Sequence, residues 1–250
     1  MVADPTTGMP PRPRQARTEK VSQSVAREIV RTIVDERLQP GAMLPAEAEM
    51  VSEYGVGRAS LREALRLLEV QGLVAMKPGP GGGPIVGSAD SAHFGRMATL
   101  FFQLAGASFS DLLEARAALE PMMVRSLAEE QDPTLIAQLK VVAVADLKDE
   151  RTYVRQAVGF HQLIASSTRN PVLNLLSSAI IDVYSSRVPG TTFPIERRQA
   201  VCDEHLAVIR AVVRRRPAKA EALMLQHMES TRADVEARYP GLLDELVGWG

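Results

Sequence analysis

Cysteine occurs only once in the 250 residues of the chain, as Cys202, which excludes an internal disulfide framework. We therefore expect a reducing, cytoplasmic location. The chain also has no apolar run that approaches the roughly 20 residues needed to cross a bilayer. Its first residues lack the hydrophobic core of a signal peptide. These absences argue against a membrane partner.

A strong excess of charge of either sign is absent as well. The 29 Lys and Arg residues nearly balance 30 Asp and Glu residues, so the formal net charge is −1. Residues 1–86 carry 11 basic against 10 acidic residues, and residues 87–250 carry 18 against 20. Composition therefore does not indicate a polyanionic partner, and any case for nucleic acid depends on where the charges lie.

The first residues lack a periodic apolar pattern and are rich in Pro, Gly and Thr. We predict a disordered leader over residues 1–19 that ends in a basic cluster of Arg12, Arg14, Arg17 and Lys20. Such a leader is either a plain tail or an arm that lies along a phosphate backbone.

Apolar periodicity predicts three helices after the leader. From Val21 to Ile33 apolar residues recur at every fourth position, so we expect an amphipathic helix over residues 21–37. A second short helix ends near Tyr54, and after a "GVG" turn a third helix covers residues 58–71.

The stretch "LVAMKPGPGGGPIV" (residues 73–86) has short β-favouring runs on either side of a Pro/Gly-rich tip, which is typical of a two-stranded hairpin. Helix, helix, tight turn, helix and hairpin in this order predict a winged helix-turn-helix domain over residues 20–87.

The third helix carries arginines at i/i+4 spacing beside its apolar stripe. Charges in this arrangement are often only a solvated face. Because this helix follows a short turn with its N-terminal end free, however, it fits the major groove of DNA, which is about 12 Å wide. The guanidinium group matches a guanine edge bidentately, and a glycine-rich wing can lie against a minor groove. The predicted DNA-contacting residues are Arg58, Ser60, Arg62, Arg66, Lys77 and Gly81.

Residues 43–86 read "MLPAEAEMVSEYGVGRASLREALRLLEVQGLVAMKPGPGGGPIV". The "LPxE" opening, the "GVxR" turn, the "LREAL" core and the "GLV" lead into a glycine wing resemble the DNA-binding domain of the GntR family of bacterial transcription regulators. The resemblance implies that Arg58 and Arg62 are the principal DNA contacts. It also shows a departure, because Ala48 stands where the family usually carries a DNA-contacting arginine.

Strand patterns of useful length are absent after residue 87, where every periodic segment is helical. We predict an all-α antiparallel helical bundle over residues 88–240 and a C-terminal tail over residues 241–250, in a mostly α chain. The helices of the bundle are expected near residues 90–105, 109–130, 133–147, 150–168, 171–186, 194–215 and 217–237.

Three of the four histidines, His161, His205 and His227, lie among apolar residues on three different predicted helices. One such histidine is more often a satisfied core residue than a ligand. Three inside one bundle each need a hydrogen-bond partner. One divalent metal satisfies all three, and imidazole suits Zn²⁺ or Ni²⁺ with coordination positions left open. Spacing alone does not establish that the three converge.

The segments "LLEARAALE" (112–120), "FHQLIASSTRNPVL" (160–173) and "EHLAVIRAV" (204–212) resemble the FCD ligand-binding domain of the FadR subfamily. The resemblance implies a metal held by the three histidines and by a carboxylate one turn before the first of them. A small organic acid then binds at the open positions of the metal. In this chain that position is Ala157, so the carboxylate is absent.

The absence of that carboxylate leaves three alternatives for the helical domain. A three-histidine metal can persist with an added water. A metal-free pocket can bind an effector directly, including larger, lipid-like molecules. The pocket can also have no effector.

Two further residues are candidates for contacts with an effector. The resemblance places Arg116 on the helix that faces the histidines, where it can meet an effector carboxylate. The alternative for Arg116 is an ion pair with Glu120, four residues later. We expect Asn170 to cap the helix that begins at Pro171, and only secondarily to line the pocket.

Together these features predict a homodimeric transcription regulator that is not an enzyme, more readily a repressor, with operator DNA and a small-molecule effector as partners. One winged helix buries too little surface to select an operator among about 10⁶ genomic sites, whereas two copies related by a twofold axis read a palindrome. The alternatives are a metal-dependent hydrolase or hydratase that uses the three histidines, and an effector-independent DNA binder.

Overall fold

The computed structural model describes residues 20–88, 91–143, 147–187 and 194–248. The chain divides into two compact units, Met1–Ala89 and Asp90–Gly250, which are described separately. The leader predicted over residues 1–19 lies outside the described residues.

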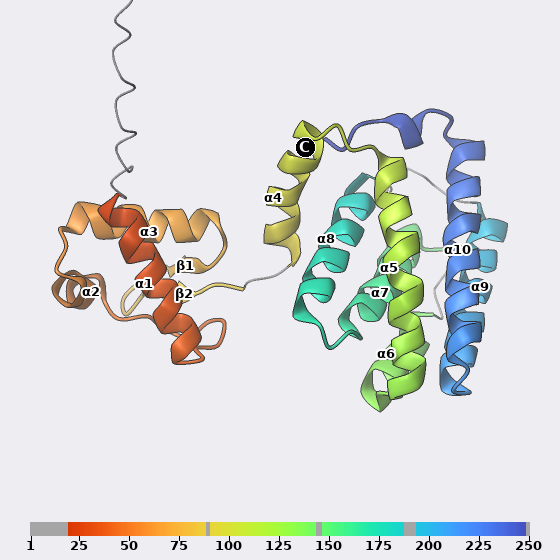
Figure 1. Cartoon of the computed structure of the whole chain (residues 1–250), viewed down its shortest axis with the longest axis horizontal. Coiled ribbons are helices and arrows are strands. Elements are labelled where there is room, and N and C mark those ends of the chain that lie inside the picture. Colours follow the sequence, from red (N-terminus) through yellow and green to blue (C-terminus); the bar gives the residue numbers. More distant parts are fainter. Residues whose placement is uncertain (1–19, 89–90, 144–146, 188–193, 249–250) are drawn as a thin grey trace, which may run out of the picture. The chain divides into compact units, whose positions relative to one another are not determined.

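Three helices and a hairpin form the first unit (Figure 1). Strands β1 and β2 pair antiparallel, with Lys77 opposite Gly83 next to the tip, and Met43 adds an isolated bridge to Ile85. The elements are α1 (Val21–Asp35), α2 (Glu47–Tyr54), α3 (Arg58–Val70), β1 (Val74–Lys77) and β2 (Gly83–Val86).

The apolar stripe of α3 forms the centre of this unit. Leu61, Leu65 and Leu68 are buried and pack in one core with residues of α1, α2 and both strands. The turn between α2 and α3 begins at Gly55, whose φ of 62° lies in the left-handed region that glycine adopts without steric cost. Because the buried stripe uses one face of α3, the arginines at positions 58, 62 and 66 remain on the exposed side.

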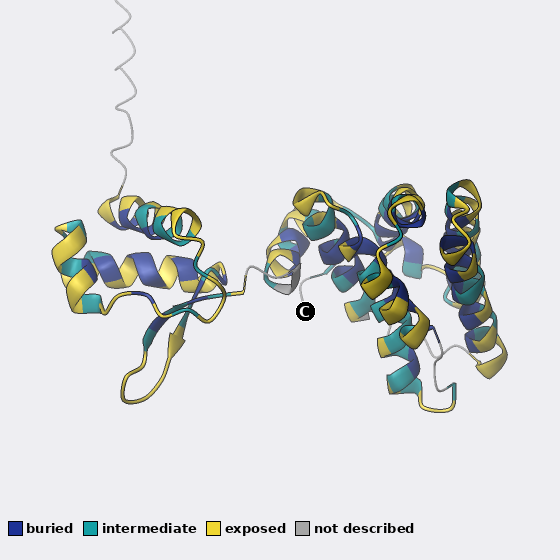
Figure 2. Cartoon of the chain, turned by 90° about the horizontal axis from the view of Figure 1, so that it is seen from below, coloured by how far each residue is buried: buried dark blue, intermediate teal, exposed yellow. Residues whose placement is uncertain are grey.

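Helices build most of the core of the second unit (Figure 1). Their inward faces are lined with buried residues (Figure 2). They are α4 (Ser91–Leu104), α5 (Phe109–Glu130), α6 (Pro133–Val142), α7 (Glu150–Ser166), α8 (Pro171–Arg187), α9 (Ile195–Val213) and α10 (Pro217–Arg238).

Helix α5 is the central element of this unit, because it packs against α7, α8, α9 and α10. Ser108 caps its N-terminus by accepting a hydrogen bond from the Asp111 N–H, and Asp111 in turn accepts from the Ser108 N–H. Its central place buries polar side chains that an outer helix would expose, among them Arg116 and Glu120.

The predicted mostly α fold, with a winged helix-turn-helix followed by an all-α bundle, is confirmed. The described residues include no helix long and apolar enough to cross a membrane.

Two predicted segments differ from the structure. The helix expected over residues 133–147 ends at Val142, and residues 144–146 lie outside the described part of the chain. The tail expected over residues 241–250 contains a short 3₁₀ helix, Leu242–Asp244, and buries Leu243 and Val247 in the core of the bundle. These two apolar side chains lie four positions apart, but the segment after Gly241 is too short for this spacing to predict an element.

Two glycine substitutions test the packing of this fold with opposite expected signs. A Cβ at Gly87 would lie 2.1 Å from the carbonyl oxygen of Gly72, so the backbone that closes the hairpin has to move. We predict that Gly87→Ala lowers the free energy of unfolding of the first unit by about 2 kcal/mol or more.

The matched control is Gly159→Ala within α7, where the nearest atom to a new Cβ is a Val142 methyl carbon at 3.7 Å. It is expected to be neutral or to stabilise the protein by up to about 1 kcal/mol. Calorimetric unfolding of the full chain measures both variants. Equal effects of the two substitutions would contradict the packing described for Gly87.

Candidate functional site

The three histidines predicted from the sequence come together inside the second unit. His161 on α7, His205 on α9 and His227 on α10 are all buried. The Nε2 atom of His227 lies 3.2 Å from Nε2 of His205 and 3.3 Å from Nε2 of His161. The three potential ligand atoms all lie within 4.8 Å of one another.

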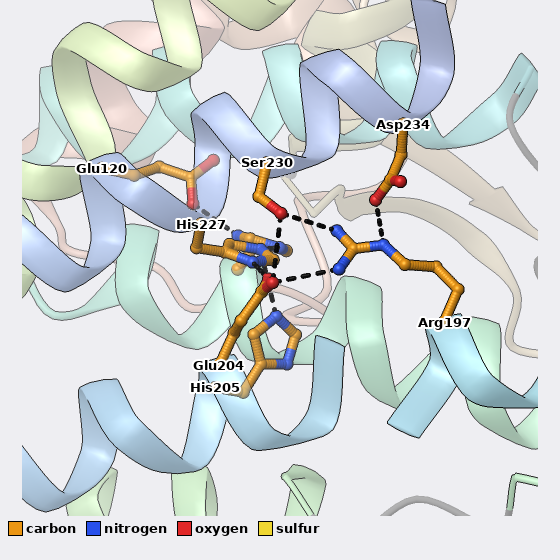
Figure 3. A network of polar contacts seen from close by, with 8 residues as sticks. Glu120, Arg197, Glu204, His205, His227, Ser230 and Asp234 are labelled. Carbon is orange, nitrogen blue, oxygen red and sulfur yellow. Dashed lines mark hydrogen bonds and ion pairs between the residues drawn. The ribbon is translucent and has the colours of Figure 1, made fainter. Parts of the chain in front are cut away.

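Hydrogen bonds on the outer sides of two rings determine which nitrogens remain free. Nδ1 of His161 lies 2.5 Å from Oε2 of Glu120, and Nδ1 of His227 lies 2.6 Å from Oε2 of Glu204 (Figure 3). Since an ionised carboxylate only accepts hydrogen bonds, each Nδ1 carries the hydrogen, and each neutral ring keeps a lone pair on Nε2. The Nε2 atoms of His227 and His161 lie 3.3 Å apart. Their lone pairs repel each other unless a proton or a cation lies between them.

Burial favours the neutral form of two of these imidazoles, His161 and His205. Desolvation lowers the pKa of His161 to about 4, although the nearby Glu120 carboxylate opposes the shift. Burial likewise lowers the pKa of His205 well below its ordinary value, with the neighbouring His227 and His161 acting in the same direction. Neutral imidazole is the form that binds metals, so the site is in its ligating state near pH 7.

Arg116 forms the ion pair with Glu120 considered from the sequence, and it also lines the cavity beside the histidines. Its Nε donates to Oε1 of Glu120 at 2.6 Å, and both side chains are buried. Burial alone would raise the pKa of Glu120, but the charge of Arg116 and the hydrogen bonds from His161 and Arg116 outweigh it and lower that pKa to about 2. Nη2 of Arg116 is buried without a hydrogen-bond partner, and the guanidinium carbon lies 4.9 Å from the ring centroid of Tyr184.

A cavity of about 90 Å³ adjoins the three rings. Ala157 lines it, together with Arg116, Tyr153, Tyr184 and Arg197. A cavity needs about 10–15 Å³ to hold one water. The space therefore holds several waters or a small ligand. A long acyl chain would need the helices to move apart.

Asn170 lies elsewhere. Its exposed side chain accepts hydrogen bonds from the N–H groups of Val172 and Leu173 at 3.0 and 3.4 Å, so it caps α8 as expected. It is not among the residues that line the cavity.

Two carboxylates beside the histidines were not foreseen in that role. The sequence indicates Glu120 only as an ion-pair partner of Arg116, because the two lie four positions apart on one helix. Its contact with His161 spans 41 positions, and the contact of Glu204 with His227 spans 23. No local spacing rule connects residues so far apart in the sequence. Glu204 is also adjacent to His205, and the sequence pattern singles out only the histidine as a candidate ligand.

The first unit exposes the residues predicted to contact DNA. Arg58, Arg62 and Arg66 are exposed along α3, and Ser60 is half-buried. Nε of Arg62 lies 3.0 Å from Oε2 of Glu47 on α2, while 75% of the Arg62 side chain stays exposed.

The wing and the start of α3 add to this surface. Lys77 and Gly81 are exposed on the hairpin, and Gly81 has a φ of 72°. The N-cap of α3 is Gly57, which offers no side-chain hydrogen bond, so the first N–H groups of the helix remain available to an anion.

The titration of the histidines gives a pH dependence for the metal-free protein. The pKa of His161 is about 4 in the folded chain against an ordinary 6.5. Between these values the unfolded chain binds more protons, so acid favours unfolding. We predict that the free energy of unfolding falls by about 2 kcal/mol between pH 7.5 and pH 5.

Urea unfolding of chelator-treated protein at the two pH values measures this loss. In the matched variant His161→Gln most of the pH dependence attributed to this ring should disappear. A wild-type free energy that stays constant over this pH range, or an unchanged dependence in the variant, would contradict the buried neutral state of His161.

Comparisons with known proteins agree with both units. The family model for bacterial regulatory proteins, gntR family, matches residues 21–82, and the FCD domain model matches residues 111–230. The HTH-type transcriptional repressor NanR of Escherichia coli (strain K12) is 28% identical over 238 residues, covering 92% of this chain and 90% of that protein. NanR of Enterobacter sp. (strain 638) is 28% identical over 236 residues, with 91% and 90% covered.

A solved structure supports the fold. The Streptococcus agalactiae GntR structure matches with a TM-score of 0.67 at 22% identity, covering 85% of this chain and 99% of that one. The resemblances to the GntR DNA-binding domain and to the FCD domain are thus confirmed. The chain contains a GntR-type DNA-binding domain followed by an FCD domain, is homologous to the repressor NanR, and is a transcription regulator.

Proposed function

We propose that the protein is a cytoplasmic repressor of the FadR subfamily that binds a palindromic operator as a homodimer and responds to a small acid. The observation that carries this proposal is the convergence of three buried histidines beside Arg116 at a small cavity. Repression is supported by the relatives, which are described as transcriptional repressors. Cytoplasmic location follows from the DNA partner.

The histidine geometry fits a divalent metal such as Zn²⁺. A Zn–N distance of 2.0–2.1 Å places two ligand atoms of a tetrahedral site about 3.3 Å apart. The Nε2 atom of His227 lies at such separations, 3.2 and 3.3 Å, from Nε2 of His205 and of His161. His161, His205 and His227 would hold the metal, and Ni²⁺ is the alternative ion. A bound metal would supply a Lewis acid with open positions that attract an anionic ligand.

The effector that fits best is a small organic acid. Arg116 lines the cavity, and its Nη2 is buried without a partner, which is costly for a charged donor. A carboxylate of the effector would satisfy this nitrogen. The small volume of the cavity favours such a molecule over a lipid-like one.

A catalytic role receives no comparable support. The described residues that line the cavity include no Asp or Glu, because Glu120 and Glu204 meet the histidines from the outer side. A hydrolase or hydratase would need a general acid or base within reach of its substrate. The chemistry of the cavity therefore fits ligand sensing.

DNA reading is assigned to α3 and the wing. Arg58 and Arg62 are exposed near the N-terminal end of the helix, where arginines of a recognition helix reach base edges and phosphates. A homodimer would place two such helices on the two halves of a palindrome.

Communication between the units would start at the histidines, which lie on α7, α9 and α10. A ligand that grips three helices changes their packing only through its different affinity for two arrangements, typically worth about 1–3 kcal/mol.

Replacement of Arg62 tests the DNA-reading surface. We predict that Arg62→Ala weakens binding to promoter DNA adjacent to the gene of this protein by about tenfold or more, because a bidentate or phosphate contact is lost. Fluorescence anisotropy over a series of salt concentrations measures the affinity.

The matched control is Arg125→Ala, which removes an exposed arginine of α5 that pairs with Glu129 and Glu221. Its DNA affinity should equal that of the wild type. Equal loss in both variants, or no loss in Arg62→Ala, would refute the assignment of α3 as the reading helix.

A carboxylate at position 157 tests the metal centre. Ala157 lines the cavity one helical turn before His161. We predict that Ala157→Asp tightens Zn²⁺ binding by about tenfold or more, since an anionic oxygen adds a ligand and offsets part of the metal charge. Competition with a chromophoric chelator measures the dissociation constant.

The control Ala157→Asn has nearly the same size without the charge, and its gain should be much smaller. Unchanged or weaker Zn²⁺ binding by the Asp variant would mean that residue 157 does not face the metal.

A further inference from the structure

A second network of polar contacts lies behind His227, at the junction of α9 and α10 (Figure 3). Oε2 of Glu204 accepts from Nδ1 of His227 at 2.6 Å. Oε1 of Glu204 accepts from Nη1 of Arg197 at 3.0 Å and from the Ser230 hydroxyl at 3.1 Å. Arg197 also donates through Nη2 to Ser230 at 3.2 Å, and its Nε pairs with Asp234.

The same arrangement occurs a second time around the site. Glu120 has one oxygen on Nδ1 of His161 and the other on Nε of Arg116. The first set joins α9 and α10, whereas the second joins α5 and α7. Two independent helix pairs thus orient a histidine of one cluster through a carboxylate that an arginine holds in place. Because the same arginine–carboxylate–histidine arrangement occurs on two unrelated pairs of helices, we infer that the orientation of the histidine rings depends on it.

Metal binding by His227 depends on which of its two ring nitrogens carries the hydrogen. With the hydrogen on Nδ1, the lone pair of Nε2 points at the other two histidines. With the hydrogen on Nε2, that position is blocked for a metal. Because His227 is only 2% exposed, water cannot easily replace Glu204 as the partner of Nδ1.

We propose that Glu204 is a positioning residue that fixes the tautomer of His227 and leaves its Nε2 free for a metal, and that Arg197 and Ser230 hold Glu204 in place. The proposal rests on the proposed metal centre. It extends that centre to Arg197 and Ser230, which act on His227 through Glu204.

The donors around Glu204 make a specific substitution informative. Arg197 can only donate, so Oε1 has to remain an acceptor. In Glu204→Gln the single amide oxygen should turn towards Arg197, and the amide NH₂ group should then face His227. Nδ1 of His227 becomes the acceptor, and its hydrogen moves to Nε2.

The experiment compares full-length, metal-free wild type with Glu204→Gln. Long-range ¹H–¹⁵N spectra report the tautomer of His227, whose signals are assigned by their loss in His227→Asn. We expect the Nδ1–H form in the wild type and the Nε2–H form in the variant. Chelator competition should show Zn²⁺ affinity reduced by about 10–100-fold.

Two further variants complete the test. Glu129→Gln changes an exposed glutamate that pairs with Arg125, and it should leave both the tautomer and the Zn²⁺ affinity unchanged. The double variant Arg197→Met with Glu204→Gln removes the obligate donor. The amide oxygen can then face His227, so the Nδ1–H form and part of the affinity should return.

Each outcome decides the proposal separately from the proposed function. If Glu204→Gln keeps the Nδ1–H form, Glu204 does not position His227, even where the affinity falls. If the double variant stays in the Nε2–H form, Arg197 has no part in it. A wild type that binds no Zn²⁺ would refute the metal centre, while the tautomers of the metal-free proteins still settle the role of Glu204.

Discussion

The site depends on keeping three imidazoles neutral and close together inside a helical bundle. Exposed imidazoles would titrate near neutral pH and repel one another as cations. Here burial lowers the pKa values of His161 and His205, so the rings stay uncharged. The lone pairs of neutral rings at this distance repel one another, and a bound divalent cation would remove that repulsion. His227 is the middle ring of the cluster, and its Nε2 atom lies close to Nε2 of both other histidines.

Burial also determines how the charged side chains around the histidines are paired. An isolated carboxylate as deeply buried as Glu120 would be expelled or protonated, but Arg116 keeps it ionised. Glu204 is 28% exposed and shares Arg197 with Asp234, so its network tolerates water at one end. Arg116 and Arg197 both line the cavity, and each is paired with a carboxylate. The unpartnered Nη2 of Arg116 is therefore the feature on which the proposed acidic ligand rests.

The sequence predicts the parts of this protein that local patterns determine. The helical spacing of Leu61, Leu65 and Leu68 is enough to predict that the arginines of α3 lie on its exposed side. His161, His205 and His227 are candidates because each lies within an apolar helix. Their convergence depends on contacts between helices far apart in the chain, and spacing carries no information about those contacts.

Other features also depend on long-range packing. The partners of His161 and His227 lie 41 and 23 positions away. Leu243 and Val247 pack in the core of the bundle although their segment is too short for its apolar spacing to predict this. Asn170 was considered for the pocket, and its local role as a helix cap is the one the structure shows. Short-range rules thus describe the caps and stripes, while the site forms where four helices meet.

Metal analysis of the purified protein addresses the central claim most directly. The protein is isolated without chelators, and its divalent metal content and thermal unfolding are measured before and after treatment with a strong chelator. The account predicts one tightly bound Zn²⁺ or Ni²⁺ per chain, with a lower unfolding temperature once it is removed and recovery when it is restored. A protein that retains no divalent metal and shows no thermal shift on addition of either ion would contradict it.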